Sequence, residues 1–122
     1  MSFQSPNNAF DARTARCVAH FNIHQPGWFR SINIATLHQG HDRYCAVAQL
    51  TKKKWKWLAP HLGLYEKEQH VDLGLYCDLP TEKQRIEYYW KQTLSFRRAI
   101  IALCAGTYVG VVQAPKDLAW AA

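Results

Sequence analysis

The sequence predicts a mainly α-helical fold of about five helices, because capping residues, apolar positions at helical spacing and a glycine stop signal recur along it. The clearest segment follows Pro80, where Thr81 and Gln84 form a capping-box pattern. Apolar residues then keep roughly helical spacing: Ile86, Trp90, Leu94, Ile101 and Cys104. Gly106 is a stop signal, so we expect a long C-terminal helix at 81–105, about 38 Å in length.

A further helix is expected near the N-terminus. Asp11 can cap it, and apolar side chains on one face favour a helix from about Asp11 to Phe21. The same region also fits a different structure, because Phe21 and Ile23 alternate with polar residues and the pair Pro26-Gly27 is typical of a turn. The alternative fold class is therefore α+β with a β-hairpin at 17–37.

The composition indicates one folded domain. Hydrophobic residues make up 48% of the 122 residues and aromatic residues 13%, which excludes disorder of the whole chain. We expect a flexible tail at 1–9 and a single globular domain at 10–122. The N-terminus lacks the basic start and apolar core of a signal peptide, and no apolar run approaches the roughly 20 residues of a membrane span. These features predict a cytoplasmic protein with no membrane partner, whose four cysteines are free thiols.

The net charge of +6 lies entirely in the first half of the chain. Residues 1–65 carry eight basic and two acidic side chains, whereas residues 66–122 carry seven of each. Such asymmetry predicts a polyanion or an acidic partner for the first half. The alternative is a solvated basic face that aids solubility.

Residues 43–58 are predicted to form a helix-turn-helix unit, with a first helix over 43–50. Asp42 can cap that helix, and Thr51 can cap a second helix, which Pro60 stops. The alternative is one amphipathic helix with a basic, solvated face.

The spacing of four residues resembles the generic pattern of helix-turn-helix domains: Leu50, Thr51, Trp55 and Leu58. Leu50 would anchor the turn, and Trp55 and Leu58 would hold the second helix to the core because they share a face. One departure is Gln49, which stands where a turn glycine is often found.

The residues expected to contact nucleic acid are basic side chains of this segment and one tryptophan: Arg43, Lys52, Lys53, Lys54, Lys56 and Trp57. Lysine is a point charge, so this set predicts phosphate affinity that falls with salt, and little base discrimination. Trp57 could stack on an unpaired base or lie buried against residues 61–79. The predicted function is non-catalytic, regulatory nucleic-acid binding, with DNA favoured over RNA and no cofactor.

Two triplets of cysteine and histidine have spacings that zinc ligands can use: Cys17, His20 and His24, then His38, His41 and Cys45. The zinc hypothesis selects four of these residues: Cys17, His20, His41 and Cys45. The alternative is buried cysteines with scattered surface histidines. We expect no metal site, because CxxC is missing and six residues exceed the four ligands of a tetrahedral site. No complete catalytic motif is present, so we expect no enzymatic activity.

A protein partner is the second functional hypothesis. Tyr88, Tyr89 and Trp90 point in several directions around the 81–105 helix, and residues 99–105 are apolar on all sides. This surface should be buried within the domain or in a homodimer formed through the 81–105 helix. In this interpretation the protein is a small interaction module, such as an inhibitor or accessory subunit of a larger nucleic-acid machine.

Overall fold

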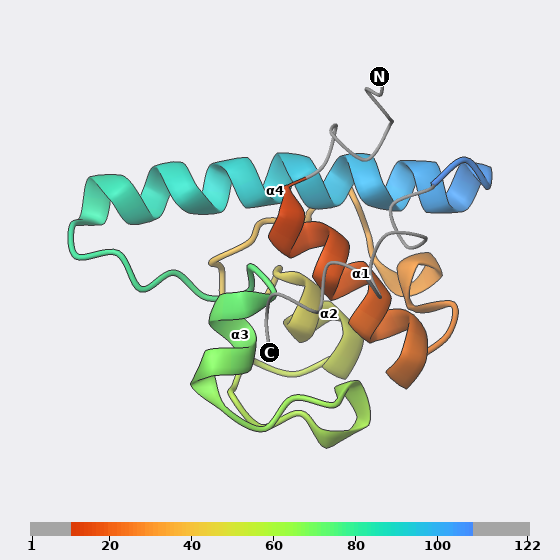
Figure 1. Cartoon of the computed structure of the whole chain (residues 1–122), viewed down its shortest axis with the longest axis horizontal. Helices are drawn as coiled ribbons and strands as arrows, with labels where there is room; N and C mark the ends of the chain where they lie inside the picture. The colour runs from red at the N-terminus through yellow and green to blue at the C-terminus, as the bar shows by residue number, and fades with distance from the viewer. Residues whose placement is uncertain (1–10, 109–122) are drawn as a thin grey trace.

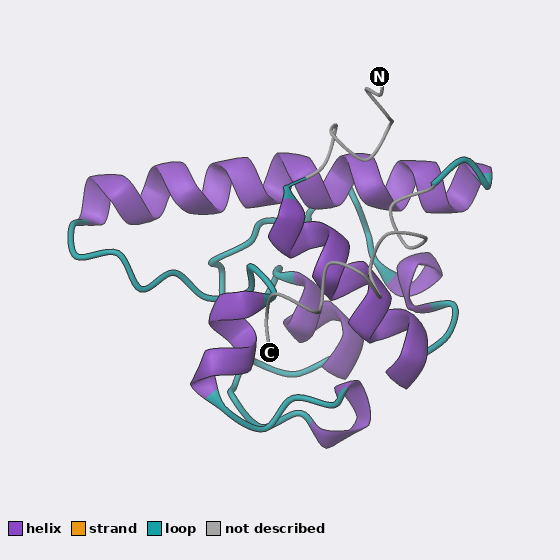
Figure 2. Cartoon of the chain, in the orientation of Figure 1, coloured by secondary structure: helices purple, strands orange, loops and turns teal. Residues whose placement is uncertain are grey.

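The fold is built from helices around one long helix, as the computed structural model shows for residues 11–108, the part of the chain that the structure describes. In chain order the elements are α1 (Ala12–His24), the 3₁₀ turn η2 (Trp28–Ser31), α2 (Ala46–Thr51), the 3₁₀ turn η3 (Pro60–Leu62), α3 (Lys67–Asp72) and α4 (Glu82–Ala105). Helix α4 runs along one edge of the molecule, and loops join the shorter helices (Figures 1 and 2). The mainly α-helical class is confirmed, with four α-helices among the described residues, and the expected tail at 1–9 lies outside them.

Helix α4 has the bounds that the sequence predicts. The Thr81 hydroxyl accepts a hydrogen bond from the Gln84 backbone N–H at 3.2 Å, and the Gln84 side-chain oxygen accepts one from the Thr81 N–H at 3.4 Å. Gly106 ends the helix with a left-handed φ of 73°, a conformation that favours glycine. Both signals are local, which is why the prediction of a helix at 81–105 is confirmed.

The β-hairpin alternative at 17–37 is wrong, because α1 occupies the place of its first strand and no strand forms among residues 17–37. Asp11 caps α1 by accepting a hydrogen bond from the Arg13 N–H at 2.8 Å. Gly27 then turns the chain with φ 79°. The Trp28 ring lies 5.1 Å from that of Phe21, and its indole N–H donates to Asn22 Oδ1 at 2.9 Å. These contacts fold residues 25–31 onto the helix.

The helix-turn-helix prediction at 43–58 is also wrong. Helix α2 contains only 46–51, and residues 52–58 form turns and irregular backbone instead of a second helix. Lys52 is left-handed, with φ 59°, which ends α2. The Trp55 N–H donates to the Asp42 carbonyl oxygen at 2.7 Å, so a tertiary bond holds the backbone that a second helix would need. Pro60 begins η3 and does not stop a preceding helix.

The core lies between α1, α2, η2 and the inner face of α4. Its largest fully buried apolar side chains include Trp28, Phe21, Phe96 and Leu37. Burial of each such side chain contributes roughly 1.5–3 kcal/mol to folding. No helix among the described residues has both the length and the apolar character that crossing a membrane requires.

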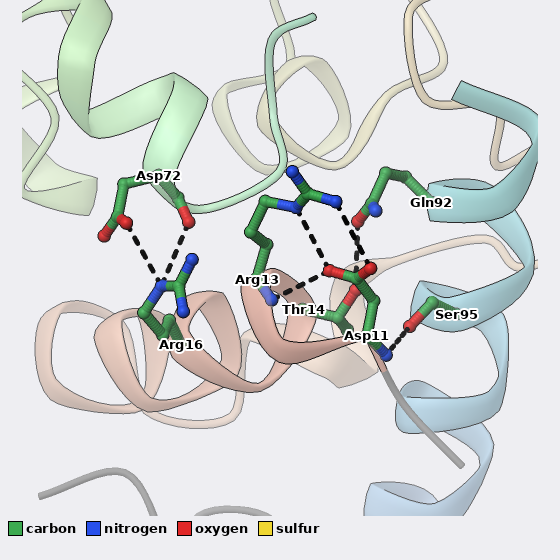
Figure 3. Close-up of polar contacts among 7 residues, drawn as sticks. All are labelled: Asp11, Arg13, Thr14, Arg16, Asp72, Gln92 and Ser95. Carbon is green, nitrogen blue, oxygen red and sulfur yellow. Dashed lines mark hydrogen bonds and ion pairs between the residues drawn. The ribbon is translucent and has the colours of Figure 1, made fainter. Parts of the chain in front are cut away.

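Polar side chains make part of the contact between α1 and α4 (Figure 3), beside apolar core residues of both helices such as Phe21 and Phe96. The Thr14 hydroxyl donates to Gln92 Oε1 at 3.2 Å, and the Asp11 N–H donates to the Ser95 hydroxyl oxygen at 2.8 Å. Gln92, Ser95 and the neighbouring Thr93 are all buried. Because these polar atoms have partners, burying them costs little.

The apolar stripe of α4 consequently faces outward. Ile86 is 61% exposed, Trp90 52% and Ile101 57%. The prediction that residues 99–105 are buried within the domain holds for Ala99 and Ile100, which are fully buried, but not for Ile101 and Cys104. Periodicity identified the stripe, whereas partners on α1 and in the 36–39 segment decide which face turns inward.

Candidate nucleic-acid interface

The segment that carries Arg43 is fixed on α4 before it enters α2. The Gln39 N–H donates to the Thr93 hydroxyl at 2.8 Å, and Gln39 Oε1 accepts from the Ala46 N–H at 2.9 Å. Gln39 is fully buried, so it joins the start of α2 to the middle of α4. The position of the Cys45 thiol is also fixed, since Sγ accepts from the Ala48 N–H at 3.4 Å as the cap of α2.

The lysine run returns to the same side of the molecule after α2. The bond from Trp55 N–H to the Asp42 carbonyl brings residues 52–55 back beside the 42–44 turn. The Asp42 carboxylate also forms an ion pair with Lys54 at 3.5 Å. Arg43 and the lysines that follow α2 therefore gather at one place, although α2 separates them in the chain.

These residues line an open surface hollow of about 330 Å³, here called the basic hollow. Its lining consists of Thr36, Arg43, Tyr44, Ala48, Gln49, Lys52, Lys53 and Lys54. All four basic side chains are exposed, and the Tyr44 ring is 46% exposed beside them. The hollow thus combines four cations with an accessible aromatic ring and small polar groups, which suits a phosphate-bearing ligand.

Three of the four cations have no ion-pair partner among the described residues. Lys54 shares Asp42 with His41, whose Nδ1 lies 3.5 Å from the carboxylate. No ion pair joins Arg43, Lys52 or Lys53 to any carboxylate among residues 11–108. Their charges are therefore available to an incoming anion. Solvent and salt partly screen the electrostatic potential that these charges create.

Lys52 has the one positive φ of a non-glycine residue in the described chain. A left-handed conformation costs a residue with a side chain roughly 1–2 kcal/mol. The same turn places the lysine at the C-terminal end of α2, where unpaired carbonyls favour a cation. The strained backbone therefore lies within the basic hollow.

Two of the predicted contact residues lie elsewhere. Lys56 is exposed but does not line the basic hollow. Trp57 is half-buried, with its ring 4.7 Å from that of Tyr76 and 5.1 Å from that of His70. Its carbonyl oxygen bonds to His70 Nε2 at 2.8 Å. The interpretation of Trp57 as packed against residues 61–79 therefore fits its contacts, and Trp57 is not positioned to stack on a base in the hollow.

Trp55, Trp57, His70 and Tyr76 form one cluster, here called the aromatic cluster. Trp55 packs against the core as the sequence predicts, whereas Leu58, its proposed partner, is 53% exposed. His70 was not predicted from the sequence as part of a cluster, because it is the last residue of the charged stretch 66–70, which is typical of a loop. Burial lowers the pKa of the His70 imidazole, with the Trp57 carbonyl acting in the opposite direction.

The four residues of the zinc hypothesis are engaged separately. Cys17 is fully buried in the core, where burial raises its pKa, and Cys45 caps α2, with its pKa raised by burial to about 11. His20 Nε2 bonds to the Leu62 carbonyl at 2.8 Å, while His41 lies beside Asp42 and Tyr44. Within residues 11–108, no group of three or more potential metal ligands is placed to hold an ion.

Comparisons with known proteins returned no match: no family model, curated protein or solved structure is significantly similar to this chain. Function is therefore inferred from the side chains and their placement.

Proposed function

We propose that this protein binds nucleic acid, DNA in the first instance, without catalysis and through the basic hollow. The observation that supports this is the convergence of Arg43 with Lys52, Lys53 and Lys54 on one open hollow, although six helical residues separate them in the chain. Three of these cations have no carboxylate partner among the described residues. A regulatory role is part of this proposal.

Binding through this surface is governed by phosphate contacts. Helix α2, which lines the hollow with Ala48 and Gln49, has only six residues, so this surface has no long recognition helix to enter a major groove. Lysine contacts to phosphate supply affinity without reading base edges. We therefore propose weak sequence discrimination and strong salt dependence.

The experiment is a salt titration of binding, followed by fluorescence anisotropy of a labelled 20-base-pair DNA duplex and of the matching single strand. With three to four phosphate contacts, the slope of log K against log salt concentration is about −2.7 to −3.6 on the duplex. That slope corresponds to an affinity loss of about 40- to 150-fold between 50 and 200 mM salt. No detectable binding to either probe at 50 mM salt would overturn the proposal.

Lys53 and Lys56 provide a matched pair for this titration, because both are exposed lysines of the same run and only Lys53 lines the basic hollow. Lys53→Ala should make the slope shallower by about 0.9, the value of one phosphate contact. Lys56→Ala removes the same charge and should leave the slope equal to the wild-type slope within experimental error. Equal effects of the two substitutions would show that net charge acts without a site.

The second candidate is a protein-interaction module, an inhibitor or accessory subunit of a larger machine. It is favoured by the exposed Ile86 and Trp90, which line an open groove of about 380 Å³ between α4 and residues 38–40. On this proposal Lys53→Ala leaves partner binding unchanged, whereas Trp90→Ala reduces it. Nucleic-acid binding has the opposite dependence, so the two substitutions distinguish the candidates.

A further inference from the structure

The outward face of α4 carries large side chains along most of the helix. It consists of Ile86, Trp90, Leu94 and Ile101, here called the outer stripe. Three of these side chains are more than half exposed, and Leu94 is partly exposed. From the first to the last, the stripe is about 22 Å long at 1.5 Å per residue.

Residues 37–40 border one margin of this stripe, where Ile86 and Trp90 face residues 38–40 and the neighbouring Arg97 guanidinium donates to the Leu37 carbonyl oxygen at 2.9 Å. The other described helices all lie on one side of α4 (Figure 1). The inner face of α4 is engaged by Thr14, Asp11 and Gln39 through hydrogen bonds to its buried polar residues. Turning the apolar stripe inward would break those bonds, so α4 cannot bury both faces within one chain.

The stripe is self-complementary when it is reversed. Ile86 and Ile101 are equidistant from the midpoint between Thr93 and Leu94. A second α4 laid antiparallel about this midpoint would therefore place isoleucine on isoleucine at both ends, with the two Leu94 side chains beside the two-fold axis. We propose that the protein is a homodimer in which two α4 helices pack antiparallel along their outer stripes.

The charges beside the stripe favour the antiparallel direction. Glu87 lies on one flank in the first half of α4, and Arg98 lies on the same flank in the second half. In the antiparallel arrangement Glu87 of each copy comes within one helical turn of Arg98 of the other. The two helix dipoles also point in opposite directions, which favours this arrangement. A parallel arrangement would not bring these opposite charges together, because a two-fold axis along the helices sets this flank of each copy against the other flank of its partner.

The exposed area is adequate for such an interface. Ile86, Trp90 and Ile101 expose about 350 Å² together, taking roughly 200 Å² for a large free side chain. This is nearly half of the roughly 800 Å² that each partner buries in an interface of standard size. The stems of the charged side chains that flank the stripe supply further area: Lys83, Glu87, Lys91 and Arg98.

The oligomeric state of the full chain tests this proposal, measured by light scattering after size exclusion at about 50 µM protein, where an interface of micromolar affinity is occupied. The wild type should have a mass of 28.2 kDa, twice the 14.1 kDa of one chain. Trp90→Glu and Ile101→Glu should each weaken the dimer at least about 100-fold, because the two-fold axis places each unpaired charge in the interface twice. Circular dichroism should show unchanged helix content, since both positions are exposed in the monomer.

Leu58→Glu is the matched control, because Leu58 is 53% exposed, like Trp90, and lies far from α4 in the chain. This variant should remain dimeric. A monomeric wild type, or a dimer that survives both stripe substitutions, would overturn the proposal.

Disulfide trapping tests whether the two α4 helices run antiparallel. In the antiparallel dimer the two Cys104 residues lie about 30 Å apart along the axis, beyond the reach of a disulfide. Leu94→Cys places two thiols beside the two-fold axis and should give a cross-linked dimer on mild oxidation. Cross-linking of the wild type through Cys104 would show parallel helices and would contradict the antiparallel arrangement.

Discussion

Gly40 joins the segment that carries the basic hollow to α4 by direct contact with an aromatic ring. A Cβ atom at Gly40 would lie 2.6 Å from two carbons of the Tyr89 ring. The ring has little freedom to retreat, because the Tyr89 hydroxyl oxygen accepts a hydrogen bond from the Cys77 N–H at 2.8 Å. Gly40 also has φ 90°, a value that side-chain-bearing residues rarely adopt.

The cost of Gly40→Ala follows from these two features. The left-handed backbone contributes about 1–2 kcal/mol. The steric overlap with Tyr89 contributes a further 1–3 kcal/mol, roughly the usual range for inserting atoms into a packed site. The free energy of unfolding should therefore fall by about 2–5 kcal/mol, a large part of the stability of a small domain.

Gly106→Ala separates the two contributions. Gly106 has φ 73°, but a Cβ atom there meets nothing within 4 Å, so only the backbone cost of about 1–2 kcal/mol applies. Urea denaturation of both variants, at one protein concentration, measures the difference. If Gly40→Ala costs no more than Gly106→Ala, the Tyr89 ring does not hold the 38–45 segment on α4, and the derived position of Arg43 is wrong.

Two further predictions concern pH and thiol reactivity. Burial lowers the pKa of His20 and His70 in the folded state, so the unfolded chain binds more protons near its histidine pKa of about 6.5. Stability should be complete above about pH 6.5 and should fall as the pH drops toward the folded pKa, by at most about 1.4 kcal/mol per pH unit for each histidine. His70→Gln should flatten this dependence in urea titrations between about pH 8 and 5, and an unchanged profile would contradict the burial of His70 as a neutral ring. With a chromogenic thiol reagent at neutral pH, Cys104 should react well before the buried Cys17, whose pKa burial raises; comparable rates for the two thiols would contradict the core packing.

The fold was predictable wherever its signals were local. The capping pair Thr81 and Gln84 and the stop at Gly106 set the ends of α4 through bonds within a few residues, so the sequence is sufficient to place them. The absence of a second helix after Thr51 was not predictable, because the bond from Trp55 to Asp42 joins residues brought together by folding. Capping residues and periodicity contain no information about such a bond.

The sequence indicated which types of residue form the candidate site, but not which individual residues line it. Charge density indicated the lysine run, and the structure brings Lys52, Lys53 and Lys54 together with Arg43. The structure holds Trp57 away from the basic hollow, because its ring packs on His70, which lies in α3, and on Tyr76, which follows α3. Which face of α4 turns inward was not predictable for a related reason: its buried polar residues bond to partners far away in the chain.

The central claim is that nucleic acid binds in the basic hollow, and lysine footprinting tests it most directly. The full chain is acetylated briefly, alone and with saturating DNA duplex at low salt, and the modification of each lysine is measured by mass spectrometry. We predict that Lys52 and Lys53 become several-fold less reactive in the complex, while Lys67, an exposed lysine of α3 outside the hollow, keeps its reactivity. Equal protection of Lys67, or none at Lys52 and Lys53, would contradict it.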